Sequence, residues 1–133
     1  MQNKIKKLEE ILKKDRFALN NDVHLVSIGK GEAQAEMLIS DKHLNGVDII
    51  QGGALFTLAD FAFAAASNSH GRIAVAANAS ISFFKGISSG KLTAYAKELN
   101  SGKSLGHFSV DIYDQNNILI AHFTGAAFFK GEY

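Results

Sequence analysis

The sequence contains no cysteine, no proline and no tryptophan, and its charges nearly cancel. The absence of cysteine excludes disulfide bonds, thiolate catalysis and four-cysteine zinc sites. Fourteen basic residues oppose 13 acidic ones, which gives a formal net charge of +1. No strong field of one sign is therefore present to attract nucleic acid or an anionic membrane surface, and we expect neither as a partner.

Long hydrophobic runs are also scarce. The N-terminal stretch is charged throughout and lacks the apolar segment of a signal peptide. The longest apolar run, residues 52–66, contains Asp60 and is shorter than the roughly 20 residues that a bilayer span needs. We therefore predict a cytoplasmic protein in which this run is a buried helix.

The 133 residues, 47% of them hydrophobic, suit one domain with a core of its own. We predict a single domain over residues 1–133, with residues 1–20 as an N-terminal helix and lead-in. Apolar residues at helical spacing predict an amphipathic helix over residues 3–14. Two extended runs around a glycine turn predict a hairpin from residues 23–28 and 32–40, followed by a loop over residues 41–50.

The second half of the chain reads as one helix followed by strands. The apolar helix should begin at Gln51-Gly52-Gly53 and end near residues 67–71, which are rich in helix terminators. Strand patterns separated by Asn, Asp and Gly turns cover residues 72–84, 91–99, 105–113 and 118–130. This order predicts an α+β fold in which a curved antiparallel sheet wraps around a long central helix.

Asp60 is a charged residue in the middle of this apolar helix, where a charge is unexpected. Apolar side chains surround the helix axis on nearly all sides, so we expect the helix to be buried. Asp60 lies too far from the helix start to act as a cap, and an unpaired buried carboxylate is costly or has a raised pKa. Thr57 lies one turn earlier on the same face. One interpretation is a structural polar window; the other, which we favour, is a general base or nucleophile in an apolar cleft.

The glycine pair at the helix start is a second candidate feature. The first N–H groups of a helix have no internal partner and carry partial positive charge, and glycine lets a ligand approach them closely. Such N–H groups suit a polarised carbonyl or a developing oxyanion. Taken alone, Gly52-Gly53 is better explained as a tight entry turn.

Together the two features predict self-association. Gly52 and Asp60 are eight residues apart, or about 12 Å along one helix. Both must reach the same carbonyl group, each within about 3 Å, which one copy of the helix does not easily allow. Two antiparallel copies across a two-fold axis would bring Gly52 of one chain near Asp60 of the other.

The run HLNGVDIIQGGALFTLADFAFAAASNSHG resembles the phenylacetate-pathway type (PaaI-like) hotdog acyl-CoA thioesterases, and the likeness extends over roughly residues 31–129. The resemblance implies hydrolysis of an acyl- or aryl-CoA by a homodimer or homotetramer, with acyl-CoA as the partner and no metal or other cofactor. It implies that Asp60 is the nucleophile or base and that the Gly52 N–H polarises the thioester carbonyl. It also implies that Asn45 helps to hold the carbonyl or the water.

Several positions depart from the family pattern. Gln51 replaces the usual histidine and can orient groups by hydrogen bonding but cannot titrate. Asn78 is a candidate for the role of a missing Ser or Thr. The remaining substrate-binding candidates are Gly53, Thr57, Phe84, Lys85 and Lys103, the two lysines as possible contacts for CoA phosphates.

Two alternatives to a thioesterase stay open at this point. One is a hotdog protein that binds acyl-CoA without turnover, which Gln51 and the missing hydroxyl residue favour slightly. The other is a hotdog dehydratase or hydratase, which normally pairs a histidine with an acid. His43 could line the cleft or be an ordinary loop histidine. The five histidines show no metal-ligand spacing.

Overall fold

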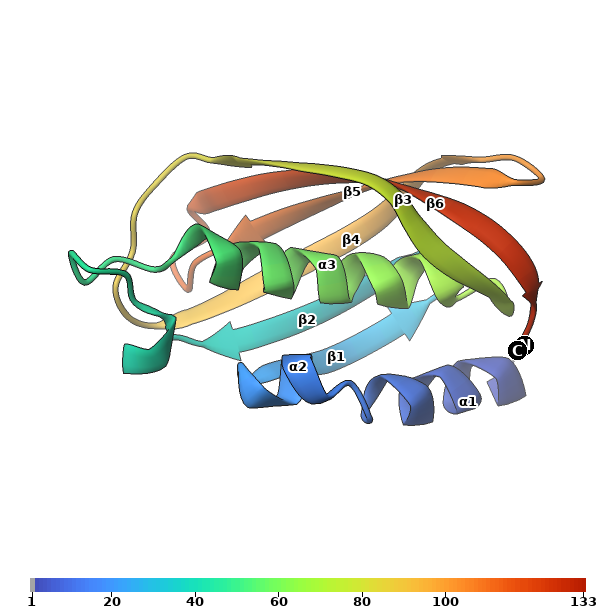
Figure 1. Cartoon of the computed structure of the whole chain (residues 1–133), viewed down its shortest axis with the longest axis horizontal. Helices are drawn as coiled ribbons and strands as arrows, with labels where there is room; N and C mark the ends of the chain where they lie inside the picture. The colour runs from blue at the N-terminus through green and yellow to red at the C-terminus, as the bar shows by residue number, and fades with distance from the viewer. Residues whose placement is uncertain (1) are drawn as a thin grey trace.

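A computed structural model describes residues 2–133, so Met1, at the start of the predicted lead-in, lies outside the described residues. Two helices are followed by a hairpin, one long helix and four further strands (Figure 1). The elements are α1 (Gln2–Leu12), α2 (Arg16–Asn20), β1 (Val23–Gly29), β2 (Glu32–Leu38), the 3₁₀ turn η1 (Asp41–His43), α3 (Gly52–Asn68), β3 (Arg72–Phe83), β4 (Lys91–Ser101), β5 (Leu105–Tyr113) and β6 (Leu119–Glu132).

The six strands form one antiparallel sheet in the order β1-β2-β4-β5-β6-β3. The strand β3 follows α3 in the chain but crosses to the far edge, where it pairs with β6. Figure 1 shows α3 lying across one face of the curved sheet, with α1 and α2 along one flank of the helix and β3 along the other. This is the predicted hotdog arrangement of a central helix wrapped by a sheet.

The core lies between α3 and the inner face of the sheet. Alternation along β4 turns Leu92, Ala94 and Ala96 inward, where all three are buried. Phe63 of α3 meets Phe108 of β5 edge-to-face, with 5.7 Å between ring centroids. Such aromatic pairs add directional packing to the burial of apolar surface.

The helix α3 is not buried on all sides, and this part of the prediction is wrong. One stripe along it stays open within the protomer: Phe56 is exposed, and Thr57, Asp60 and Ala64 are only partly covered. Their spacing of three or four residues places them on one face of the helix. Composition alone cannot show this opening, because small and aromatic residues continue across the open stripe.

The N-terminal region also differs from the prediction of one helix over residues 3–14. The helix α1 ends at Leu12, and a second helix, α2, begins after Asp15. The Asp15 carboxylate accepts a hydrogen bond of 3.0 Å from the Ala18 N–H, which is the usual bond of an N-cap residue. None of the helices within residues 2–133 combines the length and apolarity needed to cross a membrane.

Candidate active site

Asp60 lines an open cavity of about 280 Å³ on the α2 side of α3. The α3 wall of this cavity consists of Phe56, Thr57, Asp60, Phe61 and Ala64, and the opposite wall comes from Asp15, Phe17 and Ala18. The predicted pairing of Thr57 and Asp60 on one face is therefore present. The Thr57 hydroxyl donates to the Gly53 carbonyl oxygen at 2.8 Å, which fixes its orientation along the helix.

Partial burial raises the pKa of the Asp60 carboxyl above its ordinary value, and the nearby negative charge of Asp15 adds to this effect. The direction is the one expected for a carboxylate partly removed from water. Among the described residues, no hydrogen bond or ion pair to the Asp60 side chain is present. A carboxylate with raised proton affinity and free oxygens suits a general base or a nucleophile.

Gly52 lines a second, separate cavity of about 420 Å³ at the start of α3. The loop before α3 contributes Ile49 and Ile50, and the end of β3 contributes Phe83 together with the predicted Phe84 and Lys85. A Cβ atom at Gly52 would lie 3.0 Å from the Cζ atom of Phe83, so glycine leaves room for the ring there. Three predicted site residues, Gly52, Phe84 and Lys85, thus line one largely apolar cavity.

Gln51 caps the helix that Gly52 begins. Its side-chain oxygen accepts a hydrogen bond of 2.5 Å from the Gly53 N–H. The Gly53 N–H is therefore engaged, whereas no hydrogen bond to the Gly52 N–H is present within residues 2–133. Of the two predicted glycines, Gly52 is the one that offers a free donor among the described residues. Gln51 caps the helix, and its predicted role in catalysis stays a prediction.

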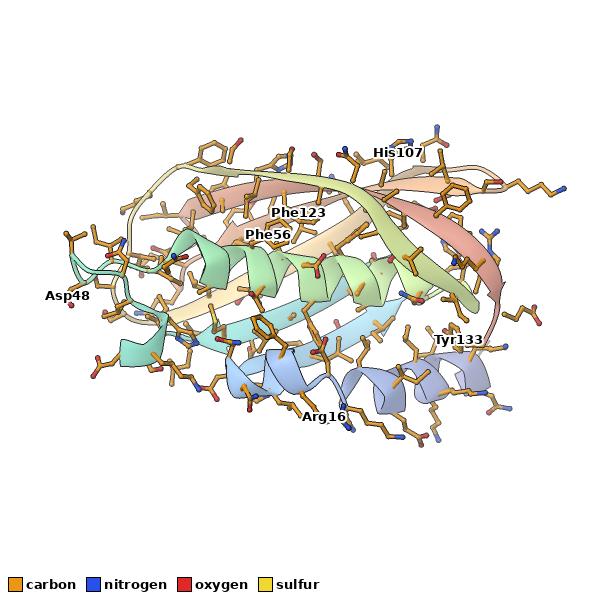
Figure 2. All side chains as sticks on the ribbon, viewed as in Figure 1. Arg16, Asp48, Phe56, His107, Phe123 and Tyr133 are labelled. Carbon is orange, nitrogen blue, oxygen red and sulfur yellow. The ribbon has the colours of Figure 1, made fainter. Side chains whose placement is uncertain are left out.

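Asn45 shapes the loop that leads to this helix. Its side-chain oxygen accepts hydrogen bonds from the N–H groups of Val47 and Ile49, at 3.0 and 3.1 Å. This Asx-type turn returns the chain toward α3, and Figure 2 shows Asp48 at its outer tip. The Asn45 side chain is exposed, so its predicted contact with a substrate carbonyl or water stays a prediction.

His43 is a structural residue, because it is only 1% exposed and both ring nitrogens bond to backbone groups. Its Nδ1 accepts from the Ser40 N–H at 3.0 Å, and its Nε2 donates to the Asn21 carbonyl oxygen at 2.8 Å. The His43 carbonyl oxygen accepts from the Gln51 N–H at 2.8 Å. His43 therefore ties α2 to the start of α3 rather than lining either cavity.

The two remaining predicted residues lie apart from both cavities within the protomer. Asn78 lines a hollow between β3, β5 and β6 together with His107 and Thr124. In Figure 2, His107 is at the upper edge of the molecule, away from the loop that carries Asp48. Lys103 is exposed in the β4–β5 turn, where its backbone oxygen accepts a bond of 2.9 Å from Arg72. Their predicted roles in substrate binding stay predictions.

Sequence reasoning missed the wall of the Asp60 cavity opposite α3, including Asp15 and Phe17. A signal for the first was present, because an aspartate directly before a run of good helix formers is typical of a helix start. The second could not be found, because only the tertiary structure brings residue 17 next to residue 60. Within residues 2–133 no group of three or more His, Asp or Glu side chains is placed to hold a metal ion.

A helix wrapped by an antiparallel sheet, with an acid on the helix and a free glycine N–H at its start, defines a hotdog protein of the thioester-hydrolysing type. The chain matches the thioesterase superfamily over residues 48–121. The chain belongs to this family.

The relatives agree with the family match. The acyl-coenzyme A thioesterase PaaI of Escherichia coli is 38% identical over 104 residues, which cover 77% of this chain and 74% of that protein. The solved structure of E. coli PaaI, from the phenylacetic acid degradation operon, matches with a TM-score of 0.92 at 32% identity, over 98% of this chain and 96% of that one. A Streptococcus mutans protein bound to acetyl CoA matches with a TM-score of 0.79 at 27% identity, over 83% and 90%. The predictions of a hotdog fold and of a PaaI-like thioester hydrolase are confirmed.

Proposed function

We propose that this protein hydrolyses acyl-CoA thioesters to a free acid and CoA at a site shared by two protomers. The observation that carries the proposal is the position of Asp60 and Gly52 on one helix but in two separate cavities. One cavity supplies a carboxylate with a raised pKa, and the other supplies a free backbone N–H. A thioester carbonyl needs both groups at once.

Two open surfaces support self-association as a homodimer, or as a homotetramer built from dimers. The strand β3 lies at the edge of the sheet with one strand partner among the described residues, and its Ile73 and Val75 are exposed. A long edge strand with apolar side chains is a ready template for another strand. The open stripe of α3 with Phe56 is a second apolar surface. A two-fold axis that pairs such surfaces creates two equivalent sites.

At each shared site the two protomers have different proposed roles. The Gly52 N–H of one protomer donates to the thioester oxygen and stabilises the negative charge that develops there. Asp60 of the other protomer either takes a proton from the attacking water or attacks the carbonyl carbon itself. The C–S bond then breaks, and the CoA thiolate leaves and takes up a proton. If Asp60 is the nucleophile, a water molecule then hydrolyses the mixed anhydride formed on its carboxylate, which releases the free acid and regenerates Asp60. Asn45, on the exposed loop before α3, would hold the water or the carbonyl through its side-chain NH₂, because its side-chain oxygen accepts bonds from the loop.

The Gly52 cavity supports a role in holding the CoA portion of the substrate. Isoleucine, leucine and phenylalanine side chains line most of it, and these suit the pantetheine arm. The exposed Lys85 at its edge can meet a phosphate group as a point charge. The acetyl CoA complex of the S. mutans relative supports a CoA ligand for this fold.

The test is a panel of acyl-CoA substrates with free-thiol detection, comparing the wild type with Asp60→Asn. We expect thiol release by the wild type and a loss of at least about 100-fold in the variant. Acyl-CoA binding without thiol release would identify a non-catalytic binding protein. Turnover of a crotonyl-type CoA without thiol release would identify a hydratase. Equal thiol release by both proteins would remove Asp60 from the mechanism.

A further inference from the structure

The wall of the Asp60 cavity opposite α3 is built by the N-terminal segment Asp15–Ala18. Ala18 is only 3% exposed, so the segment packs against the core. The Asn21 side chain donates to the Phe17 carbonyl oxygen at 2.8 Å, and the Asn21 carbonyl oxygen accepts from His43. A segment anchored by a buried residue and by hydrogen bonds at its C-terminal end can act as a fixed wall rather than as a loose arm.

Phe17 presents an uncovered ring at this wall. It is 67% exposed although the residue after it is buried, and it lines the same cavity as Asp60. An exposed phenylalanine gains free energy from any apolar group that covers it, at about 25 cal/mol per Å². The facing Phe56, Phe61 and Ala64 are apolar as well. The cavity therefore offers a ring-lined slot directly beside the reacting carboxylate.

The charge and the volume of this slot limit the kinds of acyl group that it can accept. Two titratable groups line the slot, Asp15 and Asp60. Both are acids, so a carboxylate carried by the acyl group would be repelled. A cavity of about 150 Å³ already holds a benzene ring, so one of about 280 Å³ has room for a ring or a short chain. The slot suits a neutral, apolar acyl group of modest size.

We propose that Phe17 is a specificity-determining residue that contacts the acyl group of the substrate and selects neutral apolar acyl-CoA esters. This inference rests on the proposed thioesterase function and adds to it the N-terminal segment as one wall of the acyl pocket. The acyl group lies against Phe17, Phe56 and Phe61, and its carbonyl end points toward Asp60.

The experiment compares Phe17→Ala with Leu19→Ala, a matched control on the same short helix. Leu19 is 47% exposed and lines a different hollow, with Lys13 and His24. With hexanoyl-CoA we expect Phe17→Ala to lower kcat/KM about tenfold, since deleting apolar contacts in a substrate pocket has effects of that order. With acetyl-CoA, whose single methyl group has little apolar surface to bury against the ring, we expect less than a twofold change. Leu19→Ala should leave both values unchanged.

A binding measurement separates this inference from the proposed function. Titration calorimetry on Asp60→Asn, with and without Phe17→Ala, uses hexanoyl-CoA and free CoA as ligands. We expect the second substitution to weaken hexanoyl-CoA at least about fivefold and free CoA less than twofold. Equal effects on both ligands, or none, would overturn the role of Phe17. Selective weakening in a protein whose wild type releases no thiol would keep that role and refute the hydrolysis.

Discussion

Asp60→Asn should abolish turnover and at the same time stabilise the fold at neutral and higher pH. Burial and the charge of Asp15 raise the pKa of Asp60 in the folded protein above its value in the unfolded chain. A carboxyl group with a raised folded-state pKa contributes stability below its unfolded pKa, and this contribution is lost as the pH rises through the folded pKa. At pH 8 the wild type therefore carries an ionised, partly desolvated carboxylate, and the asparagine variant does not.

The size of this gain follows from the partial exposure of Asp60. Solvent screening keeps it near the lower end of single-site stabilisations, at about 0.5–1 kcal/mol. For a domain of this size that corresponds to a rise in Tm of roughly 2–5 °C. The activity loss should be far larger, about 100- to 10,000-fold in kcat, because a positioned base or nucleophile is removed.

The assay is urea unfolding of both proteins at pH 8 and pH 4, at one fixed protomer concentration because self-association contributes to the apparent stability. The stability difference should be present at pH 8 and should shrink at pH 4, where Asp60 becomes protonated. All other titrating groups are common to both proteins. A variant that is less stable at pH 8, or a difference that does not change with pH, would refute this reasoning about Asp60.

Three further substitutions test the surroundings of the site. Gly52→Ala should lower kcat/KM roughly 10- to 100-fold with little change in Tm, because the methyl group covers the N–H while the exposed Phe83 ring can turn aside; an unchanged kcat/KM would contradict the donor role. Asp15→Asn keeps the helix cap but removes the charge. It should lower the pKa of Asp60, which a pH–rate profile would show as an acid limb moved to lower pH; an unmoved limb would contradict the coupling. His43→Leu leaves two partly buried backbone groups without partners and should cost about 1–3 kcal/mol in urea unfolding, and no measurable loss would contradict the structural assignment.

Most of the fold could be predicted from the sequence because its signals are local. Alternating apolar residues between Asn, Asp and Gly turns placed all four later strands within two residues of their ends, and the glycine pair placed the start of α3. The helix α2 was missed because five residues are too few to show helical periodicity. The open stripe of α3 was missed because it depends on which neighbours fail to cover the helix.

The candidate site, like the fold, could be predicted from the sequence only in part. The separation of Asp60 from Gly52 follows from helix geometry alone, and the structure places the two in different cavities. Family resemblance predicted Phe84 and Lys85 as substrate-binding residues, but only the structure places them in the Gly52 cavity. The approach of Phe17 to Asp60 joins residues 43 positions apart and depends on how α2 packs, which no local pattern encodes.

The most direct test of the shared site is complementation between two inactive variants. Asp60→Asn and Gly52→Val are each expected to be nearly inactive alone, since each lacks one half of every site. After the two are unfolded, mixed in equal amounts and refolded together, random pairing should restore about a quarter of the wild-type thiol release, because one site in four receives both intact halves. No recovery in a mixture shown to contain hybrid oligomers would contradict a site built from two protomers.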